Sequence, residues 1–202
     1  PEAVTSRLGR AVAARVWPCA ALRGTFRLFA RMQPSLGDWL AEAERRYNPM
    51  SYHNGSIWPH DNAMIAVGLA RYGLKSGVEK IMTGMFEVSL VLDFHRLPEL
   101  FCGFVRRPGQ GLTRYPVACN PQAWAAGSAF MVLQACLGLS ILASEQKVVF
   151  NHPILPEFID KMQIKNLKVG TASVDLLLRR HDLDVGITVI RRMGKVEVIS
   201  RQ

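Results

Sequence analysis

The hydrophobic period of this chain changes near residue 145, and that change limits what the chain can fold into. Before it, apolar residues recur at helical spacing. The spacing predicts three helices, over residues 59–72, 76–94 and 121–142. Pro59 suits a first helical turn, and Gly73 suits the position just after a helix. The loop at 95–121 is long enough to be typical of a functional segment.

After residue 145, β-branched residues alternate with polar ones or form short runs, and turn residues such as Gly170 and Gly194 separate them. The segments predicted as strands are Lys147–Phe150, Met162–Val169, Ala172–Leu178, Val185–Arg191 and Lys195–Ile199. Such a series predicts a small antiparallel sheet packed on a helical body. The chain has no internal repeat and no low-complexity tract.

The composition is that of a packed protein. The 202 residues suffice for one domain or a little more, and 49% of them are apolar. A bilayer span needs roughly 18 uninterrupted apolar residues. The longest apolar stretch, 123–143, is interrupted by glycine, serine and glutamine. A buried helix explains that stretch better, and we expect no membrane partner.

The formal net charge of +9 first suggests a nucleic-acid partner. Residues 1–37 supply much of it, with six arginines, no lysine and one acid. The other basic residues are scattered, so nucleic-acid binding is disfavoured; it would predict salt-sensitive binding lost on deleting residues 1–37. An Arg-rich, acid-poor start is also typical of a transit peptide, although serines are few; a lead-in segment is the other interpretation.

The four cysteines do not form a metal or disulfide pattern. None belongs to a C-x-x-C pair, and no histidine stands at zinc-like spacing from them. Cys136 lies in the apolar stretch and is expected to be a buried thiol. Cys102 and Cys119 bracket a loop and are free to approach each other, but one such pair is weak evidence for an oxidising compartment. The cysteines favour a reducing, cytoplasmic location.

The segment 52–62 concentrates side chains that bind sugars. It reads Tyr-His-Asn-Gly-Ser-Ile-Trp-Pro-His-Asp-Asn, and it ends in a predicted helix N-terminus. Aromatic faces stack on pyranose rings, and polar groups hold the hydroxyls. The residues we expect to bind substrate here are Tyr52, His53, Asn54, Trp58, His60 and Asp61. The alternative is that Asp61 only caps or charges the first helical turn.

Glu99 stands between Pro98 and Leu100, directly after a predicted helix. Burial among apolar neighbours would raise the pKa of its carboxyl, which suits proton transfer. The alternative is a surface glutamate whose neighbours anchor the turn. Gln122 and Trp124, at the start of the third predicted helix, are further candidates for substrate binding, with Trp124 equally compatible with core packing.

Two other groups of residues have simpler interpretations. Asn120 before Pro121 is a plausible N-cap for the third predicted helix. Arg106, Arg107 and Arg114 could clamp an anion, but loop arginines more often are solvated or pair with nearby acids. His95 and His152 have no partner visible in the sequence and are assigned no role.

An ordered series of motifs carries a family resemblance. The motifs are Tyr47-Asn48-Pro49, the segment 52–62, Pro98-Glu99-Leu100-Phe101, Tyr115-Pro116 and the segment 121–127. They resemble bacterial amylo-α-1,6-glucosidase (glycogen debranching enzyme-like) proteins, which are six-hairpin glycosidases with an (α/α)6 toroid. The resemblance runs from about Tyr47 to the C-terminus and leaves residues 1–46 unmatched. The motif series is specific to the superfamily and less specific to a substrate.

The resemblance implies roles for particular residues. Glu99 matches the carboxylate that looks like the general base activating water. The Trp58-Pro59-His60-Asp61 segment matches the lining of a sugar subsite. Inverting hydrolysis needs two carboxylates about 6.5–9.5 Å apart. The family's general acid comes from an earlier hairpin, which has no match in this chain, and the family gives no reason to assign that role to Asp61.

These observations predict a mainly α fold: the last hairpins of a partial (α/α)6 toroid, followed by a small antiparallel β segment. The expected divisions are a lead-in at 1–46, the catalytic portion at 47–145 and a β-rich segment at 146–202. The predicted function is hydrolysis of α-glucosidic bonds in glycogen-like glucans or related α-glucosides. That chemistry requires no metal or organic cofactor.

The chain alone is expected to be inactive. Because part of a toroid leaves apolar helix faces unburied, self-association is also expected. The alternative function is a non-catalytic carbohydrate-binding or assembly module.

Overall fold

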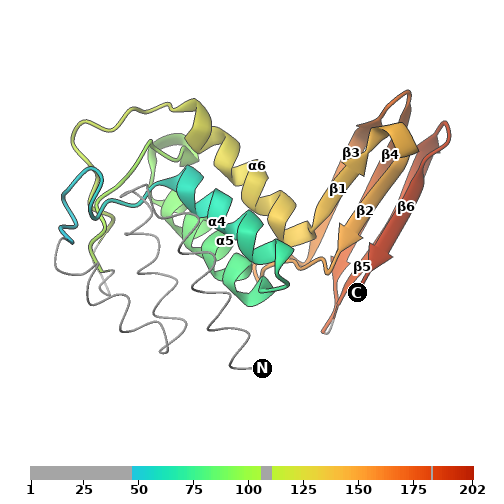
Figure 1. Cartoon of the computed structure of the whole chain (residues 1–202), viewed down its shortest axis with the longest axis horizontal. Helices are drawn as coiled ribbons and strands as arrows, with labels where there is room; N and C mark the ends of the chain where they lie inside the picture. The colour runs from blue at the N-terminus through green and yellow to red at the C-terminus, as the bar shows by residue number, and fades with distance from the viewer. Residues whose placement is uncertain (1–46, 106–110, 183) are drawn as a thin grey trace. The chain divides into compact units, whose positions relative to one another are not determined.

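A computed structural model describes residues 47–105, 111–182 and 184–202. The predictions for the lead-in at 1–46, Cys19, Arg106 and Arg107 lie outside these residues. The chain divides into two compact units. The first unit holds the described residues up to Met64 together with Met85–Ser128. The second unit holds Ile65–Gly84 and Ala129–Gln202. The elements are labelled in Figure 1.

Helix α4 spans Pro59–Arg71, close to the prediction of 59–72. The carbonyl oxygen of Trp58 accepts the first helical hydrogen bond, from the Asn62 amide at 3.1 Å, so Pro59 occupies the first helical position. At the other end Gly73 adopts φ 72°, and the Leu74 amide donates to Leu69 O at 3.0 Å. This is a Schellman ending, and it confirms Gly73 as the residue that terminates the helix.

Helix α5 spans Lys75–Leu90, and a short 3-10 turn follows at Asp93–His95. Helix α6 spans Ala123–Leu137, so the prediction of a helix over 121–142 was too long at both ends. The helix stops because Gly138 adopts φ 56° and packs against the Asn151 backbone, where a Cβ atom would overlap the Asn151 carbonyl oxygen. The four residues after Gly138 form strand β1, Leu139–Leu142.

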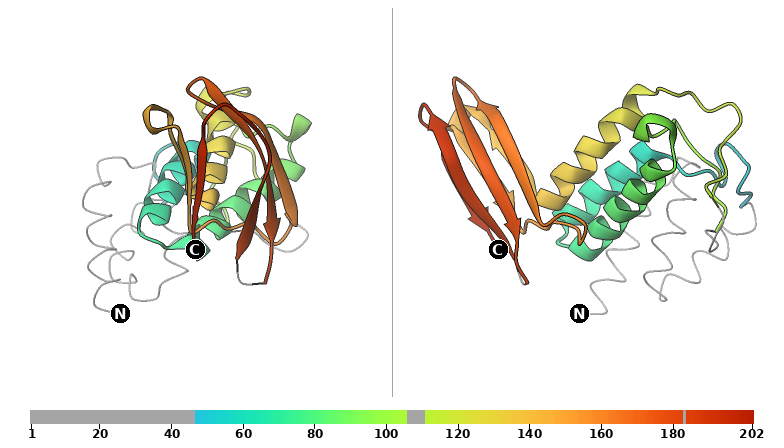
Figure 2. Two further views of the ribbon diagram at one scale, coloured as in Figure 1. Left: turned by 90° about the vertical axis from the view of Figure 1, so that its right-hand side faces the viewer. Right: turned by 180° about the vertical axis from the view of Figure 1, so that it is seen from behind.

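The second unit contains two three-stranded sheets among the described residues (Figures 1 and 2). In one, β2 (Lys147–Asn151) lies between β1 and β6 (Glu197–Arg201). In the other, β4 (Ala172–Arg180) lies between β3 (Lys161–Val169) and β5 (Val185–Met193). All neighbours are antiparallel except β2 and β6, which pair in parallel.

One apolar core serves both sheets of the second unit. Phe150 of β2 and Leu176 and Leu178 of β4 are completely buried in it. Alternate residues of β4 face this core, as the period of a strand requires. The five strands predicted after residue 145 are confirmed within a few residues, but they do not form one antiparallel sheet.

The predicted fold class was wrong. The described residues contain three α-helices and two three-stranded sheets, which is a mixed α/β structure without a toroid. Strands β3, β4 and β5 have nine residues each, and β1 occupies four residues that were predicted as helix. Strand and helix therefore have almost equal shares of the described residues. Within the described parts of the chain, no helix has both the length and the apolar character needed to cross a membrane.

Candidate functional site

The first unit brings the segment 52–62 and Glu99 together through backbone pairing. Ile57 and Phe101 exchange hydrogen bonds, with N···O distances of 2.8 and 3.0 Å. The Gly103 amide donates to Pro49 O at 2.9 Å, and the Tyr47 hydroxyl donates to Gly103 O. These backbone hydrogen bonds join the segments around residues 47–57 and 99–103, which are far apart in the sequence. Both segments supply side chains to the candidate site.

Glycine makes this close approach possible at two positions. A Cβ atom on Gly103 would overlap the carbonyl oxygen of Gly55, and a Cβ atom on Gly55 would overlap that of Asn48. Only a residue without a side chain fits where two backbones meet so closely.

Glu99 is buried and held from two sides. Its side chain is 6% exposed. The Tyr52 hydroxyl donates to Oε1 at 2.8 Å, and the Cys119 amide donates to Oε2 at 3.2 Å. The Glu99 amide in turn donates to Cys119 O at 2.9 Å, which fixes the backbone on which the side chain stands. Both carboxyl oxygens are thus oriented by donors from different segments.

The pKa of Glu99 lies below its ordinary value of 4.5. Burial alone would raise this pKa, but the hydrogen bonds from Tyr52 and Cys119, together with nearby His60, favour the ionised form and outweigh burial. The expectation of a raised pKa was therefore wrong, because the sequence does not reveal the donors that surround the carboxylate. The same contact raises the pKa of Tyr52 to about 12, which keeps the phenol protonated and donating.

An aromatic cluster that includes Tyr52 lies beside this carboxylate. Trp58 is 5% exposed, and its Nε1 donates to Tyr52 O at 3.1 Å. The Tyr52 ring meets the Trp58 ring edge-on at 4.8 Å, and His53 stacks parallel to Trp58 at 6.1 Å. Edge-to-face contacts of this kind fix ring positions. The cluster therefore holds the Tyr52 hydroxyl in place rather than leaving it free to rotate into solvent.

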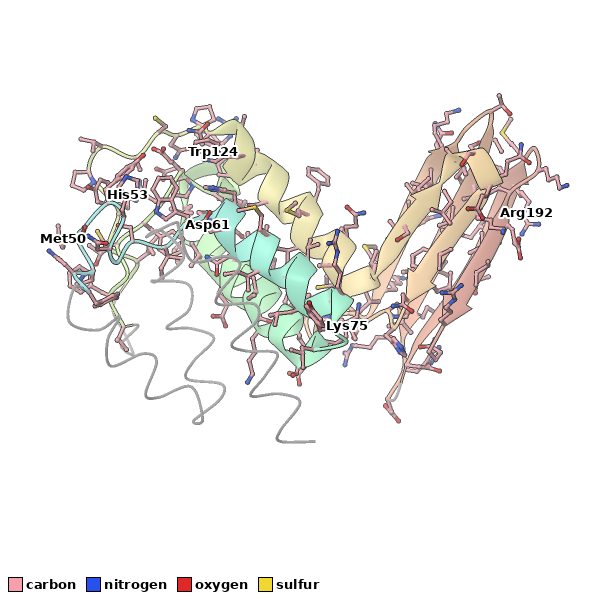
Figure 3. All side chains as sticks on the ribbon, in the orientation of Figure 1. Met50, His53, Asp61, Lys75, Trp124 and Arg192 are labelled. Atoms are coloured by element: carbon pink, nitrogen blue, oxygen red, sulfur yellow. The ribbon has the colours of Figure 1, made fainter. Side chains whose placement is uncertain are left out.

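Trp124 extends the cluster to the surface. Its ring stacks on His60 with centroids 4.9 Å apart, and 48% of the residue is exposed. In Figure 3, Trp124 lies at the start of α6 and Asp61 at the start of α4. A half-exposed indole beside polar groups is a surface on which the C–H face of a sugar can stack. The ring also lies 6.5 Å from that of the buried Trp58, so one part of Trp124 packs inward while the rest faces solvent.

The partly exposed His60 and the buried Asp61 form a pair in the first turn of α4. His60 Nε2 lies 3.0 Å from Asp61 Oδ1, and Asp61 is 3% exposed. Within the part of the chain that the structure describes, Asp61 Oδ2 and His60 Nδ1 are buried without a hydrogen-bond partner. Burial raises the pKa of Asp61, and His60 opposes that rise. Both unpaired atoms are shielded from solvent, so they belong to the interior of the site and not to the surface that Trp124 exposes.

Gln122 makes a local contact with its side chain, and Asn54 contributes its backbone to a turn. The Asn54 amide donates to Ser51 Oγ at 3.3 Å within a turn. Gln122 Oε1 accepts from the Ala123 amide at 2.9 Å, and its carbonyl oxygen accepts from Ala126, so Gln122 caps α6. The prediction of Asn120 as the N-cap was wrong by two residues.

Sequence reasoning missed Tyr115 and Cys119 as members of this group. Tyr115 packs on Tyr52 with ring centroids 5.7 Å apart, and the Tyr-Pro pair in a long loop was the only signal for it. Cys119 contributes its backbone amide, for which no sequence signal exists. Among the described cysteines, Cys102, Cys119 and Cys136 are free thiols, and the prediction that Cys136 is buried is confirmed.

Arg114 pairs with Asp93 at 2.9 Å on the surface, which is the ordinary role of a loop arginine. In residues 47–105, 111–182 and 184–202, no group of three or more His, Cys, Asp or Glu side chains is arranged to hold a metal ion. Comparison of the chain with protein-family models gave no match, and neither did comparison with curated proteins. The geometry of the site and the resemblance of its motifs are therefore what a proposal of function rests on.

Proposed function

We propose that this chain carries the water-activating side of a glycosidase site for α-glucosidic bonds in glycogen-like glucans or related α-glucosides. One observation carries the proposal: Glu99 is a buried, ionised carboxylate oriented by Tyr52 and Cys119 beside an aromatic cluster that ends in half-exposed Trp124. A general base must be ionised before it can accept a proton, and the lowered pKa of Glu99 meets that requirement.

The reaction assigned to Glu99 is the deprotonation of water. A lone pair on the carboxylate takes a proton from water while the water oxygen bonds to the anomeric carbon and the glycosidic C–O bond breaks. A second group must protonate the departing oxygen. We assign that role to no described residue, because Asp61 is already paired with His60. Towards glycosides whose leaving oxygen needs a proton, we therefore expect no turnover by this chain.

A substrate with a leaving group that needs no proton tests the base directly. α-Glucosyl fluoride loses fluoride without help from a general acid, so only water activation remains to be catalysed. We expect the chain to release fluoride faster than buffer does, measured with a fluoride electrode. Glu99→Gln should lower that rate by about 10²- to 10⁴-fold, the usual contribution of a general base. Glu157→Gln, at an exposed carboxylate of the second unit, should leave it unchanged.

Fluoride release no faster than in buffer, or release that survives Glu99→Gln, contradicts the base role. The second candidate function, a carbohydrate-binding module without catalysis, is supported by the exposed Trp124 ring, which suits sugar stacking whatever Glu99 does. It predicts quenching of tryptophan fluorescence by malto-oligosaccharides without fluoride release. Trp124→Ala should abolish that quenching, and it is a better probe than the buried Trp58, whose loss would disturb the fold.

A further inference from the structure

The side chain of Tyr52 is fully engaged in the site before any ligand arrives. Its hydroxyl donates to Glu99 Oε1 at 2.8 Å, and its ring contacts those of His53, Trp58 and Tyr115 at centroid distances of 4.7, 4.8 and 5.7 Å. Its carbonyl oxygen is held by Trp58 Nε1. A phenol fixed at the ring, the backbone and the hydroxyl cannot turn towards a sugar without leaving Glu99.

The hydrogen bonds described at Glu99 leave lone pairs with which the carboxylate can accept a proton from water. An ionised carboxylate has about four lone-pair positions. Tyr52 occupies one on Oε1, and the Cys119 amide occupies one on Oε2. The remaining lone pairs keep the direction that these two donors impose. A base held in this way presents a defined lone pair to water, whereas a freely rotating carboxylate does so only part of the time.

We propose that Tyr52 is the positioning residue of Glu99, orienting the carboxylate that activates water, and is not a sugar-binding residue. The inference rests on the proposed function for its catalytic consequence, but the hydrogen bond and its effect on Glu99 are independent of any substrate. Among the described residues, the titratable groups that face Glu99 are Tyr52, Cys119 from the loop before α6, and His60 from α4. Tyr52 is the largest of the influences that lower its pKa.

The direction of the pH effect follows from the hydrogen bond. The donor stabilises the carboxylate, so Glu99 stays ionised down to a pH below its ordinary value of 4.5. Fluoride release should rise with pH through the pKa of Glu99 and then level off. In Tyr52→Phe the carboxylate loses this donor while the ring remains, so both the pKa of Glu99 and the rising limb of the rate should move to higher pH.

The test is a titration of ¹³C-labelled glutamate side chains in the full chain, with the Glu99 signal assigned from its loss in Glu99→Gln. Tyr52→Phe should raise the pKa of Glu99. Tyr115→Phe, which removes a hydroxyl from the same cluster without touching the Tyr52–Glu99 hydrogen bond, should not. With α-glucosyl fluoride, Tyr52→Phe should lower kcat about tenfold and leave KM within twofold.

An unchanged Glu99 pKa in Tyr52→Phe, or an equal shift in Tyr115→Phe, overturns the inference, as does a large rise in KM with kcat retained. If Tyr52→Phe fails to fold, 3-fluorotyrosine in place of Tyr52 keeps the ring and provides a more acidic donor, which should lower the pKa of Glu99 further. A pKa shift without fluoride release would leave Tyr52 as the positioning residue while refuting the glycosidase proposal. The experiment can therefore refute the positioning role of Tyr52 and the glycosidase proposal independently of each other.

Discussion

Gly103 and Gly55 are the single residues on which the geometry of the site depends most directly. At each position a Cβ atom would overlap a backbone carbonyl oxygen. Because the overlapped atom belongs to the backbone, no side-chain rotation can relieve the overlap. We expect Gly103→Ala to reduce the free energy of unfolding by about 3 kcal/mol, at the upper end of overpacking costs, as measured by urea denaturation. It should also weaken quenching of tryptophan fluorescence by malto-oligosaccharides, because the bridge between Ile57 and Phe101 shifts.

Gly84 provides the matched control. It lies inside α5, and a Cβ atom there would meet nothing within 4 Å. Gly84→Ala should stabilise the protein by about 0.5–1 kcal/mol, the helix preference for alanine. A Gly103→Ala protein as stable as the wild type would show that the two backbones can separate at little cost.

At the same scale, the sequence predicted the identity of the site residues better than their roles. Tyr52, Trp58, Glu99 and Trp124 could be chosen as candidates from their residue types alone, because a sequence shows the chemistry of each side chain. The ionisation of Glu99 was not predictable, since it depends on the Cys119 amide and the Tyr52 hydroxyl, which only the fold brings near. Gln122 was chosen by residue type, and its side chain accepts from the Ala123 amide at the start of α6.

At the scale of elements, the end of α6 is completed by a side chain from another helix. Lys75, the first residue of α5, donates from Nζ to Ala135 O at 2.9 Å and to Cys136 O at 3.1 Å. The last carbonyl groups of a helix have no partner within it, and a cation there also meets the negative end of the helix dipole. Burial lowers the pKa of Lys75, against an opposing effect of Cys136.

We expect Lys75→Met to reduce the free energy of unfolding by about 2 kcal/mol, because methionine keeps most of the aliphatic packing but removes a charged hydrogen-bond donor. The Ala135 and Cys136 carbonyl oxygens would then keep only their backbone bonds from Gly138 and Ile154, at 3.3 and 2.9 Å. Urea denaturation followed by circular dichroism measures the change. Lys80→Met, at an exposed position of the same helix, should stay within about 0.5 kcal/mol of the wild type. Equal losses in both variants would mean that the lysine charge, and not its contact with α6, is responsible.

Element boundaries were predictable where a local signal exists. Pro59 and Gly73 fixed the two ends of α4 because each acts through its own backbone. The end of α6 was missed because Leu139–Leu142 is as apolar as the helix before it, and an apolar run does not distinguish helix from strand. Only the pairing of β1 with β2 decides the matter.

At the scale of the whole molecule, the second unit depends on one core shared by two sheets. Leu176 is completely buried in that core, at the centre of β4. We expect Leu176→Ala to cost about 3 kcal/mol in the free energy of unfolding, from lost burial and the cavity left behind. Ile190→Ala, at a residue of β5 that is 51% exposed, should cost less than about 1 kcal/mol. Similar urea midpoints for the two variants would contradict a shared core.

The fold class could not be predicted at this scale, although most elements could. Motif resemblance concerns residues near a site, and it does not report how strands from 139 to 201 pair. The sequence showed five of the strands, but the parallel neighbour of β2 is a non-local choice that alternation cannot reveal. The toroid was an extension of the resemblance beyond the residues that carry it.

The parallel pairing of β2 with β6 also bears on the order in which the second unit folds. Lys147 pairs with Glu197, so β2 gains one of its two neighbours only when the chain returns about 50 residues later, and such long-range closure is slow. Strands β3, β4 and β5 form between these two partners as successive hairpins of short reach. We therefore expect the hairpins to form first, and the three-residue buried run of β2 to gain its second neighbour only afterwards.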